Sequence, residues 1–380
     1  MAIDLGRFID LFSENFDKLG ELGASICIWH NGSQVLNLAD GFWDREKTVP
    51  WSAQTPVLIW SATKGLASAC LLHALSRQNI SLERRVVDFW PEYDRNGKGQ
   101  TTLLHVLSHQ AGQPALRDDS ISVLDHQAVA EQLAAQEPFW VPGEAHGYHP
   151  RTFGFLVDEL LRRITQCTDI GAYFRETFAN PFKLDLWIGA PESVLEGIAP
   201  VHAPRKARTQ NKEEDRFYEA LASPGSLASE SFSTPAGFRA PSLMNDPKIR
   251  MHPIPSFGGI GTAESLAQFY YLFGSGELLD TNTIEQVSKL KCSGEDRVLL
   301  IPTAFGAGFM KDPVENHNKS RSLFGPSLTA FGQPGAGGSN GFFDPENKVA
   351  FAYVMNQMEP GLFPNRKSLR IVKEFYDRCL

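Results

Sequence analysis

The 380-residue sequence predicts an α/β (α+β) fold, in which a mixed, mainly antiparallel sheet is flanked by helices from both ends of the chain. Three observations support this prediction. A helix pattern and a hairpin pattern lie near the start, a strand–turn–strand–helix pattern lies at the end, and helical patterns fill the middle. We therefore expect one domain over residues 1–380, with a sheet-containing lobe at 1–57 and 250–380 and a helical lobe at 58–249.

The predicted helices are segments whose apolar residues recur with the period of an amphipathic helix. They lie at residues 4–19, 152–164 and about 366–378. In the second segment, Phe153, Leu156 and Leu160 share one face. The stretch from Ala203 to Asp246 instead mixes charged residues with Ser, Pro and Gly, which predicts a long surface excursion and a candidate lid over a site.

The predicted strands come in two pairs. Apolar runs at 24–30 and 34–38 flank Asn31-Gly32, and Asn-Gly between such runs is the strongest short signal for a hairpin. Near the other end, residues 335–344 and 348–356 predict two strands joined by a turn that contains Pro and Asn.

Charge and hydropathy exclude several kinds of partner. The formal net charge is −8 and no basic stripe is present, which argues against nucleic acid as a partner. The first ten residues include acids and no long apolar run, and no stretch approaches the roughly 20 apolar residues that span a bilayer. We therefore expect neither an export signal nor a membrane anchor.

The cysteine pattern predicts a reducing setting. The five cysteines are an odd number at wide, irregular spacing, which does not suggest a disulfide framework and favours a cytoplasmic location. The ten histidines include no H-E-x-x-H and no zinc-like pairing with cysteine, so we expect no metal.

The strongest chemical signal is Ser61-Ala62-Thr63-Lys64. A serine and a lysine three residues apart lie on one face of a helix, and a neutral amine can accept the proton of the hydroxyl. The apolar run before Ser61 and the apolar helix pattern after Lys64 predict a partly desolvated amine with a lowered pKa. The alternative is a serine near a helix start whose lysine neighbour reaches into water.

A second Ser-x-x-Lys occurs at Ser288–Lys291, so the spacing alone is weak evidence. This copy lies in a polar stretch that includes Lys289, Glu295 and Asp296. We expect it to be a solvated helix end.

Ser339 is a competing nucleophile, because residues 337–341 match G-x-S-x-G. The hydrolases that use this motif need an acid and then a histidine downstream of the serine. The last histidine is His317, which precedes Ser339, so that order cannot be completed. We interpret these glycines as allowing close backbone approach to a cleft.

Several motifs now coincide with one family, in order and over nearly the whole chain. They are Ser61-x-x-Lys64, residues 103–112 (LLHVLSHQAG), 142–149 (PGEAHGYH), 258–263 (GGIGTA) and 332–338 (GQPGAGG). Together they resemble the serine β-lactamase and penicillin-binding-protein superfamily in its class C branch, and most closely the family VIII carboxylesterases. The resemblance implies a serine β-lactamase-like fold and no cofactor.

The resemblance also implies roles for individual residues. Ser61 is the nucleophile that becomes acylated, Lys64 takes or relays its proton, and Tyr148 is the partner base that activates water for deacylation. The backbone N–H groups of Ser61 and Ala336 form the oxyanion hole. The implied substrate-binding residues are Gln333, Gly335 and His149.

Two segments depart from the family pattern. Tyr148-His149-Pro150 lacks the asparagine of Tyr-x-Asn, and we expect Pro150 to start the following helix. Gln333-Pro334-Gly335 replaces Lys-Thr-Gly, and a neutral amide and a proline cannot supply a cation and a hydroxyl. This favours neutral esters over anionic β-lactams. Aromatic residues in the same regions are candidates for an acyl pocket or for the core, namely Trp60, Phe139, Trp140 and Trp187.

We therefore expect a serine hydrolase that acts on short- to medium-chain carboxylic esters through an acyl-enzyme on Ser61. One alternative is a β-lactamase or D-Ala peptidase, against which the departure from Lys-Thr-Gly and the expected lack of an export signal both argue. A second is an acyltransferase to an alcohol acceptor, which would use the same residues. A binding protein on the same fold is the non-enzyme alternative.

Overall fold

The computed structural model describes residues 5–206, 208–209, 211–238, 240–315 and 318–380. Its main feature is an eight-stranded sheet with the strand order β2-β1-β13-β12-β11-β8-β7-β6. Each described pairing in this sheet is antiparallel. The strands are β1 (Gly23–His30), β2 (Ser33–Gly41), β6 (Cys292–Glu295), β7 (Pro302–Phe305), β8 (Met310–Lys311), β11 (Phe331–Pro334), β12 (Asn340–Asp344) and β13 (Val349–Met355).

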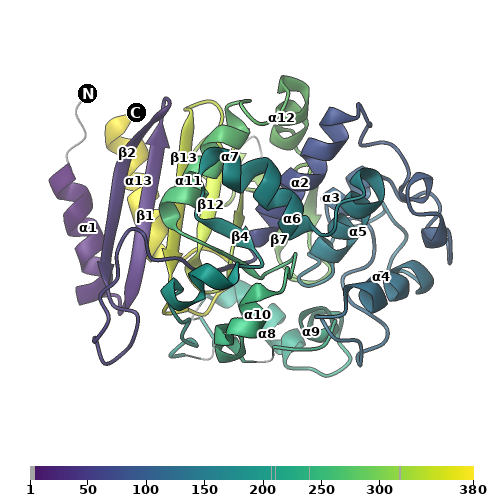
Figure 1. Cartoon of the computed structure of the whole chain (residues 1–380), viewed down its shortest axis with the longest axis horizontal. Coiled ribbons are helices and arrows are strands. Elements are labelled where there is room, and N and C mark those ends of the chain that lie inside the picture. Colours follow the sequence, from purple (N-terminus) through teal and green to yellow (C-terminus); the bar gives the residue numbers. More distant parts are fainter. Residues whose placement is uncertain (1–4, 207, 210, 239, 316–317) are drawn as a thin grey trace.

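The side chains of the central strands alternate between two apolar clusters, as the two-residue period of a strand requires. Phe351 and Tyr353 of β13 pack with the terminal helices α1 (Leu5–Asp17) and α13 (Arg366–Cys379). Ala350 and Ala352 face the other way, toward α11 (Ala263–Gly274). The sheet is therefore covered by helices on both faces, with α1 and α13 on the outer one (Figure 1).

The strongest sequence patterns correspond to these elements. The helix predicted at 4–19 is α1, although residue 4 lies outside the described residues. The hairpin is β1–β2, and both turn residues have positive φ, 50° at Asn31 and 84° at Gly32. The last two predicted strands pair as β12 and β13, and the predicted closing helix is α13. The expected α/β fold with a mainly antiparallel sheet and terminal helices is confirmed.

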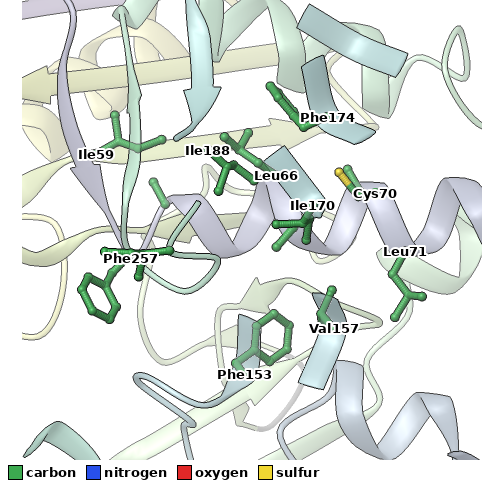
Figure 2. Close-up of a cluster of buried hydrophobic side chains, with 14 of the residues drawn as sticks. Ile59, Leu66, Cys70, Leu71, Phe153, Val157, Ile170, Phe174, Ile188 and Phe257 are labelled. Carbon is green, nitrogen blue, oxygen red and sulfur yellow. The ribbon is translucent and has the colours of Figure 1, made fainter. Parts of the chain in front are cut away.

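Helix α2 (Thr63–Arg77) is buried almost all round. Figure 2 shows Leu66, Cys70 and Leu71 of this helix surrounded by apolar side chains of neighbouring elements. One neighbour is α5 (Phe153–Thr165), the helix predicted at 152–164. The other α-helices are α3 (Leu103–Leu107), α4 (His126–Ala135), α6 (Ile170–Phe174), α7 (Asn180–Phe182), α8 (Asp215–Leu221), α9 (Leu227–Ser233), α10 (Pro247–Met251) and α12 (Thr281–Ser288).

A small three-stranded sheet lies between the main sheet and α2. Its order is β3-β5-β4, with β3 at Val57–Trp60, β5 at Gly259–Gly261 and β4 at Leu186–Ile188. No pattern in the sequence predicted this sheet. A two-stranded ribbon, β9 (Val314–Glu315) with β10 (Asn318–Lys319), completes the strands.

Two expectations about loops need revision. Pro150 does not start a helix, because it lies in a turn and α5 begins three residues later at Phe153. The carbonyl of Pro150 is used instead as a hydrogen-bond acceptor for Lys64. The excursion at 203–246 holds α8 and α9 and buries Phe217, so it is more than a surface loop. That it closes over a site stays a prediction, and its residues 207, 210 and 239 lie outside the description.

Within the described residues, no helix combines the length and the apolar composition needed to cross a bilayer.

Candidate active site

A strained turn carries Ser61 from β3 into α2. Trp60, the last residue of β3, has a φ of 51°, which a bulky residue adopts only when its surroundings enforce it. The hydroxyl of Thr63 enforces it here, because it donates to the Trp60 carbonyl at 2.5 Å and accepts from the Gly259 N–H at 2.7 Å. Ser61 is thereby held, half-buried, just before the first residue of α2.

The amine of Lys64 is fully buried and has three polar neighbours. Its Nζ lies 3.2 Å from Ser61 Oγ, 2.8 Å from the Pro150 carbonyl oxygen and 2.9 Å from the Ser256 carbonyl oxygen. Burial lowers the pKa of Lys64 well below its usual range. A neutral amine has two hydrogens and one lone pair. Two carbonyl acceptors occupy both hydrogens, so the lone pair is left to accept the Ser61 hydroxyl proton.

Tyr148 completes this cluster. Lys64 Nζ lies 4.8 Å from the centre of its ring, and its hydroxyl shares a hydrogen bond with Ser61. Burial raises the pKa of the Tyr148 phenol above its usual range, and the bond with Ser61 acts in the opposite direction. Tyr148 is therefore a neutral phenol at physiological pH, suited to passing a proton between neighbours.

The end of β11 lies against the end of β3. A Cβ atom at Gly335 would approach the Ile59 carbonyl oxygen to 2.2 Å, so only glycine fits there. Ala336 follows and is exposed, and the prediction that its N–H forms an oxyanion hole with that of Ser61 stays a prediction. Gln333 is buried, and its Nε2 lies 3.5 Å from the Tyr148 hydroxyl, at the outer limit of a hydrogen bond.

Ser339 makes a structural contact and does not occupy a reactive position. Its side chain is fully buried and donates to the Ile59 carbonyl at 3.0 Å. It thus ties β12 to the strand that ends next to Ser61. His317, the last histidine of the chain, lies outside the described residues.

The second Ser-x-x-Lys does not form a pair. Ser288 is the last residue of α12, as expected for a helix end, and Lys291 donates to Gln286 at 2.6 Å. Asp296, which belongs to the same polar stretch of the sequence, is fully buried. Its exposed neighbours Glu295 and Arg297 conceal this in the sequence.

The histidines around Tyr148 are engaged within the protein. His149 donates from Nδ1 to the Gly147 carbonyl at 2.6 Å and accepts at Nε2 from the Gln113 N–H at 3.0 Å. Burial lowers its pKa to about 3. That His149 binds substrate stays a prediction, and these two bonds leave only its carbon atoms for such a contact. His109 accepts from the His149 N–H at 3.0 Å and stacks on Phe153.

The aromatic candidates divide into two groups. Trp60 and Trp187 are half-buried at the small sheet, and Trp60 adjoins the nucleophile. Trp140 is buried against His149, and the guanidinium of Arg117 lies 3.8 Å from the ring centre of Phe139. The second group therefore supports the segment that carries Tyr148.

The sequence did not reveal two hydrogen-bond acceptors of the Lys64 amine, which are the carbonyl groups of Pro150 and Ser256. Backbone atoms have no residue-type signature, so no sequence signal could have found them. Cavities of about 460 and 590 Å³ do not include Ser61, and in the larger one the lining residue Arg163 is paired with Glu92 and Glu159. The described residues bring together no group of three or more His, Cys, Asp or Glu side chains able to hold a metal.

Comparisons with known proteins place the chain in one family. A family model described as Beta-lactamase matches residues 8–373. The Esterase/beta-lactamase LipL of Mycobacterium tuberculosis is 31% identical over 358 residues, covering 88% of this chain and 77% of that protein.

Two solved structures match over almost the full length. A family VIII carboxylesterase is 29% identical with a TM-score of 0.86, covering 99% of this chain and 97% of its own. A penicillin-binding-protein homologue from Caulobacter crescentus is 30% identical with a TM-score of 0.85, covering 99% and 98%.

The buried amine predicts an unusual dependence of stability on pH. Burial lowers the folded pKa of Lys64 below its unfolded value of about 10.4, so between these two values the amine is neutral when folded and protonated when unfolded. The free energy of unfolding should therefore rise with pH between the folded and unfolded pKa values, by up to about 1.4 kcal/mol per pH unit. We expect Lys64→Met to remove this rise between pH 7 and 9.

Urea unfolding of wild type and Lys64→Met at several pH values measures how the free energy of unfolding changes with pH. Lys289→Met, at a lysine whose side chain is 59% exposed, is the control and should keep the rise. An identical pH slope in wild type and Lys64→Met would mean that the buried amine stays protonated.

Proposed function

Because this chain belongs to the beta-lactamase family, we propose that it is a serine carboxylesterase that hydrolyses short- to medium-chain esters through an acyl-enzyme on Ser61. The observation that carries the proposal is the 3.2 Å approach of Lys64 Nζ to Ser61 Oγ, with both amine hydrogens directed at carbonyl groups. Support also comes from the matches to an esterase/beta-lactamase and to a family VIII carboxylesterase.

Acylation starts with proton transfer from the Ser61 hydroxyl to the neutral Lys64 amine. Ser61 Oγ attacks the ester carbonyl, and the oxyanion accepts hydrogen bonds from the N–H groups of Ser61 and Ala336. As the intermediate collapses, the ester C–O bond breaks. The alcohol leaves with the proton, which returns from Lys64 through the Tyr148 hydroxyl.

Deacylation reverses these roles. Water gives its proton through Tyr148 to Lys64 and attacks the acyl carbonyl. The acid is released when Ser61 Oγ regains the proton. Because the pKa of the Tyr148 phenol is raised, Tyr148 can pass this proton from one neighbour to the next but does not persist as a phenolate.

The charge pattern favours neutral substrates. Gln333 presents a neutral amide where the resemblance places a lysine, and its neighbour Pro334 has no hydroxyl. A β-lactam carboxylate would lose its water without gaining a charged partner at this position. The relative named esterase/beta-lactamase makes weak cephalosporin hydrolysis a second candidate activity of the same serine.

The nucleophile is tested by substitution and by labelling. We expect Ser61→Ala to reduce p-nitrophenyl butyrate hydrolysis at least about a thousandfold, because no other group can form the acyl-enzyme. Ser288→Ala, in the second Ser-x-x-Lys, is the matched control and should retain activity. Peptide mapping after reaction with a fluorophosphonate should place the label on Ser61. A label on Ser339 would contradict the assignment.

The acid limb of the pH–rate profile should report Lys64. Since its neutral form is the base, kcat/KM for p-nitrophenyl butyrate should fall tenfold per pH unit below its folded pKa and stay level above it, up to the alkaline range in which Tyr148 ionises. Burial lowers the pKa of His109 well below its usual range and that of His149 to about 3, so neither side chain can produce a limb near neutral pH. Lys64→Arg, which cannot lose its charge, should be inactive over the whole range. Substantial activity in Lys64→Arg would exclude Lys64 as the base.

The neutral amide at 333 should control the choice between ester and β-lactam. Gln333→Lys should raise the ratio of nitrocefin to p-nitrophenyl butyrate turnover about tenfold, which corresponds to about 1.4 kcal/mol from one charge-assisted contact. Gln333→Met changes the side chain without adding charge and should leave the ratio near that of wild type. Equal shifts in both variants would point to pocket volume in place of charge.

A further inference from the structure

A buried carboxylate lies directly behind Tyr148. Both oxygens of Asp296 accept from the Tyr148 backbone N–H, each at 3.0 Å. The N–H groups of Val298 and Leu299 donate to the same carboxylate at 2.9 and 2.8 Å, and the Thr303 hydroxyl donates at 2.9 Å. Asp296 thus connects the tyrosine to the turn between β6 and β7.

The segment that carries Tyr148 depends on such external contacts. Residues 145–149 lie outside helices and strands, so their N–H groups have no regular partners. The Gly147 N–H donates to the His109 carbonyl at 3.1 Å, and the His149 N–H donates to His109 Nδ1 at 3.0 Å. The Tyr148 N–H lies between these two groups and donates to the Asp296 carboxylate. Two residues from distant parts of the chain therefore fix the backbone of the tyrosine.

The described hydrogen-bond partners of the Asp296 side chain are all donors, which is the environment of a carboxylate. Burial raises its pKa, while the N–H groups of Leu299, Tyr148 and Val298 lower it. The Thr303 hydroxyl gives its hydrogen to Asp296, so it must accept at its other side from His146 Nε2, 3.0 Å away. In the series His146–Thr303–Asp296, each hydrogen bond is therefore donated toward Asp296.

We propose that Asp296 is a positioning residue for Tyr148, which holds the tyrosine backbone so that the phenol meets Ser61 and Lys64. This inference rests on the proposed esterase function. It differs from a purely structural role, because loss of the Asp296 carboxylate should lower kcat only when the Tyr148 phenol is present.

The charge of Asp296 has a second effect on the same phenol. It adds to burial in raising the pKa of Tyr148. The other titratable groups near this ring are Lys64, His109, His146 and His149, and burial lowers the pKa of each. Loss of the Asp296 charge should therefore move the alkaline limb of kcat to lower pH.

The test is a double-mutant cycle with p-nitrophenyl butyrate. Asp296→Asn keeps the shape of the side chain, but it must turn an NH₂ group toward one of the donors. We expect kcat to fall about 10- to 100-fold with KM changed less than about threefold, because the proton path is misplaced while binding is retained. In a Tyr148→Phe background the same change should cost less than about threefold. An equal loss in both backgrounds, or no loss in either, would overturn the proposal.

Asp312→Asn is the matched control. Asp312 is also buried and accepts from two backbone N–H groups, those of Leu323 and Phe324, at 2.8 and 3.2 Å. This control should lose stability while kcat and the alkaline limb stay within about threefold and 0.3 pH units of wild type.

A milder pair of variants covers the case in which Asp296→Asn does not fold. Thr303→Val removes one donor to Asp296 and should lower kcat severalfold in the wild type but not in Tyr148→Phe, and Thr303→Ser should restore it. A Thr303→Val loss that persists in Tyr148→Phe would count against the proposal.

The rate of Ser61 labelling by a fluorophosphonate separates this inference from the proposed function. If wild type labels at Ser61 but hydrolyses no ester, the esterase proposal fails. Slower labelling in Asp296→Asn, absent in the Tyr148→Phe background, would still support Asp296. An unchanged labelling rate would overturn it.

Discussion

The structure depends on keeping one amine neutral in a buried place. Lys64 lies in the first turn of a helix that is apolar on nearly every side, and its amine contacts two carbonyl groups and no carboxylate of the described residues. Those carbonyl groups come from segments 86 and 192 residues further along the chain. The fold must therefore bring the start of α5, the segment before β5 and the end of β3 to one point. The Thr63 hydroxyl, between the Trp60 carbonyl and the Gly259 N–H, connects two of these three segments.

This constraint also explains the departure at position 150. A proline has no N–H, and its carbonyl remains as a strong acceptor. With that carbonyl directed at Lys64, residue 150 cannot be the first residue of α5, and the Arg151 carbonyl is likewise occupied by the Ser256 hydroxyl at 2.5 Å. The helix begins only after both carbonyl groups have been used. No asparagine amide is present at position 150. The described partners of the Lys64 amine are all oxygen atoms, namely Ser61 Oγ and the carbonyl oxygens of Pro150 and Ser256.

The elements with a clear periodicity were predictable, and the residues that support the site were not. The amphipathic pattern of α1, the Asn31-Gly32 turn and the pair Ser61 and Lys64 all act locally, so sequence spacing carries their signal. The small sheet escaped because β4 and β5 have three residues each, too few for a period. Asp296 escaped because burial is a property of the fold, and its neighbours on both sides are exposed. Gly335 and Ser339 were recognisable as a glycine-rich segment, but their contact with Ile59 joins strands 280 residues apart.

Burial disfavours the charged forms of the groups around Ser61 Oγ, and this bears on the proposed substrate. A neutral amine, a neutral phenol and, at a longer distance, a neutral amide face one another in a buried setting. Where the effective dielectric is low, a charge that appears during the reaction interacts strongly with fixed dipoles, whereas a charge already on the substrate must first lose its water. Hydrolysis of a neutral ester creates its negative charge only in the transition state, at the oxygen that the Ser61 and Ala336 N–H groups would receive. An anionic substrate would lose its water on entry without gaining a charged partner near Gln333, so the site would favour a neutral substrate whose charge appears only in the transition state.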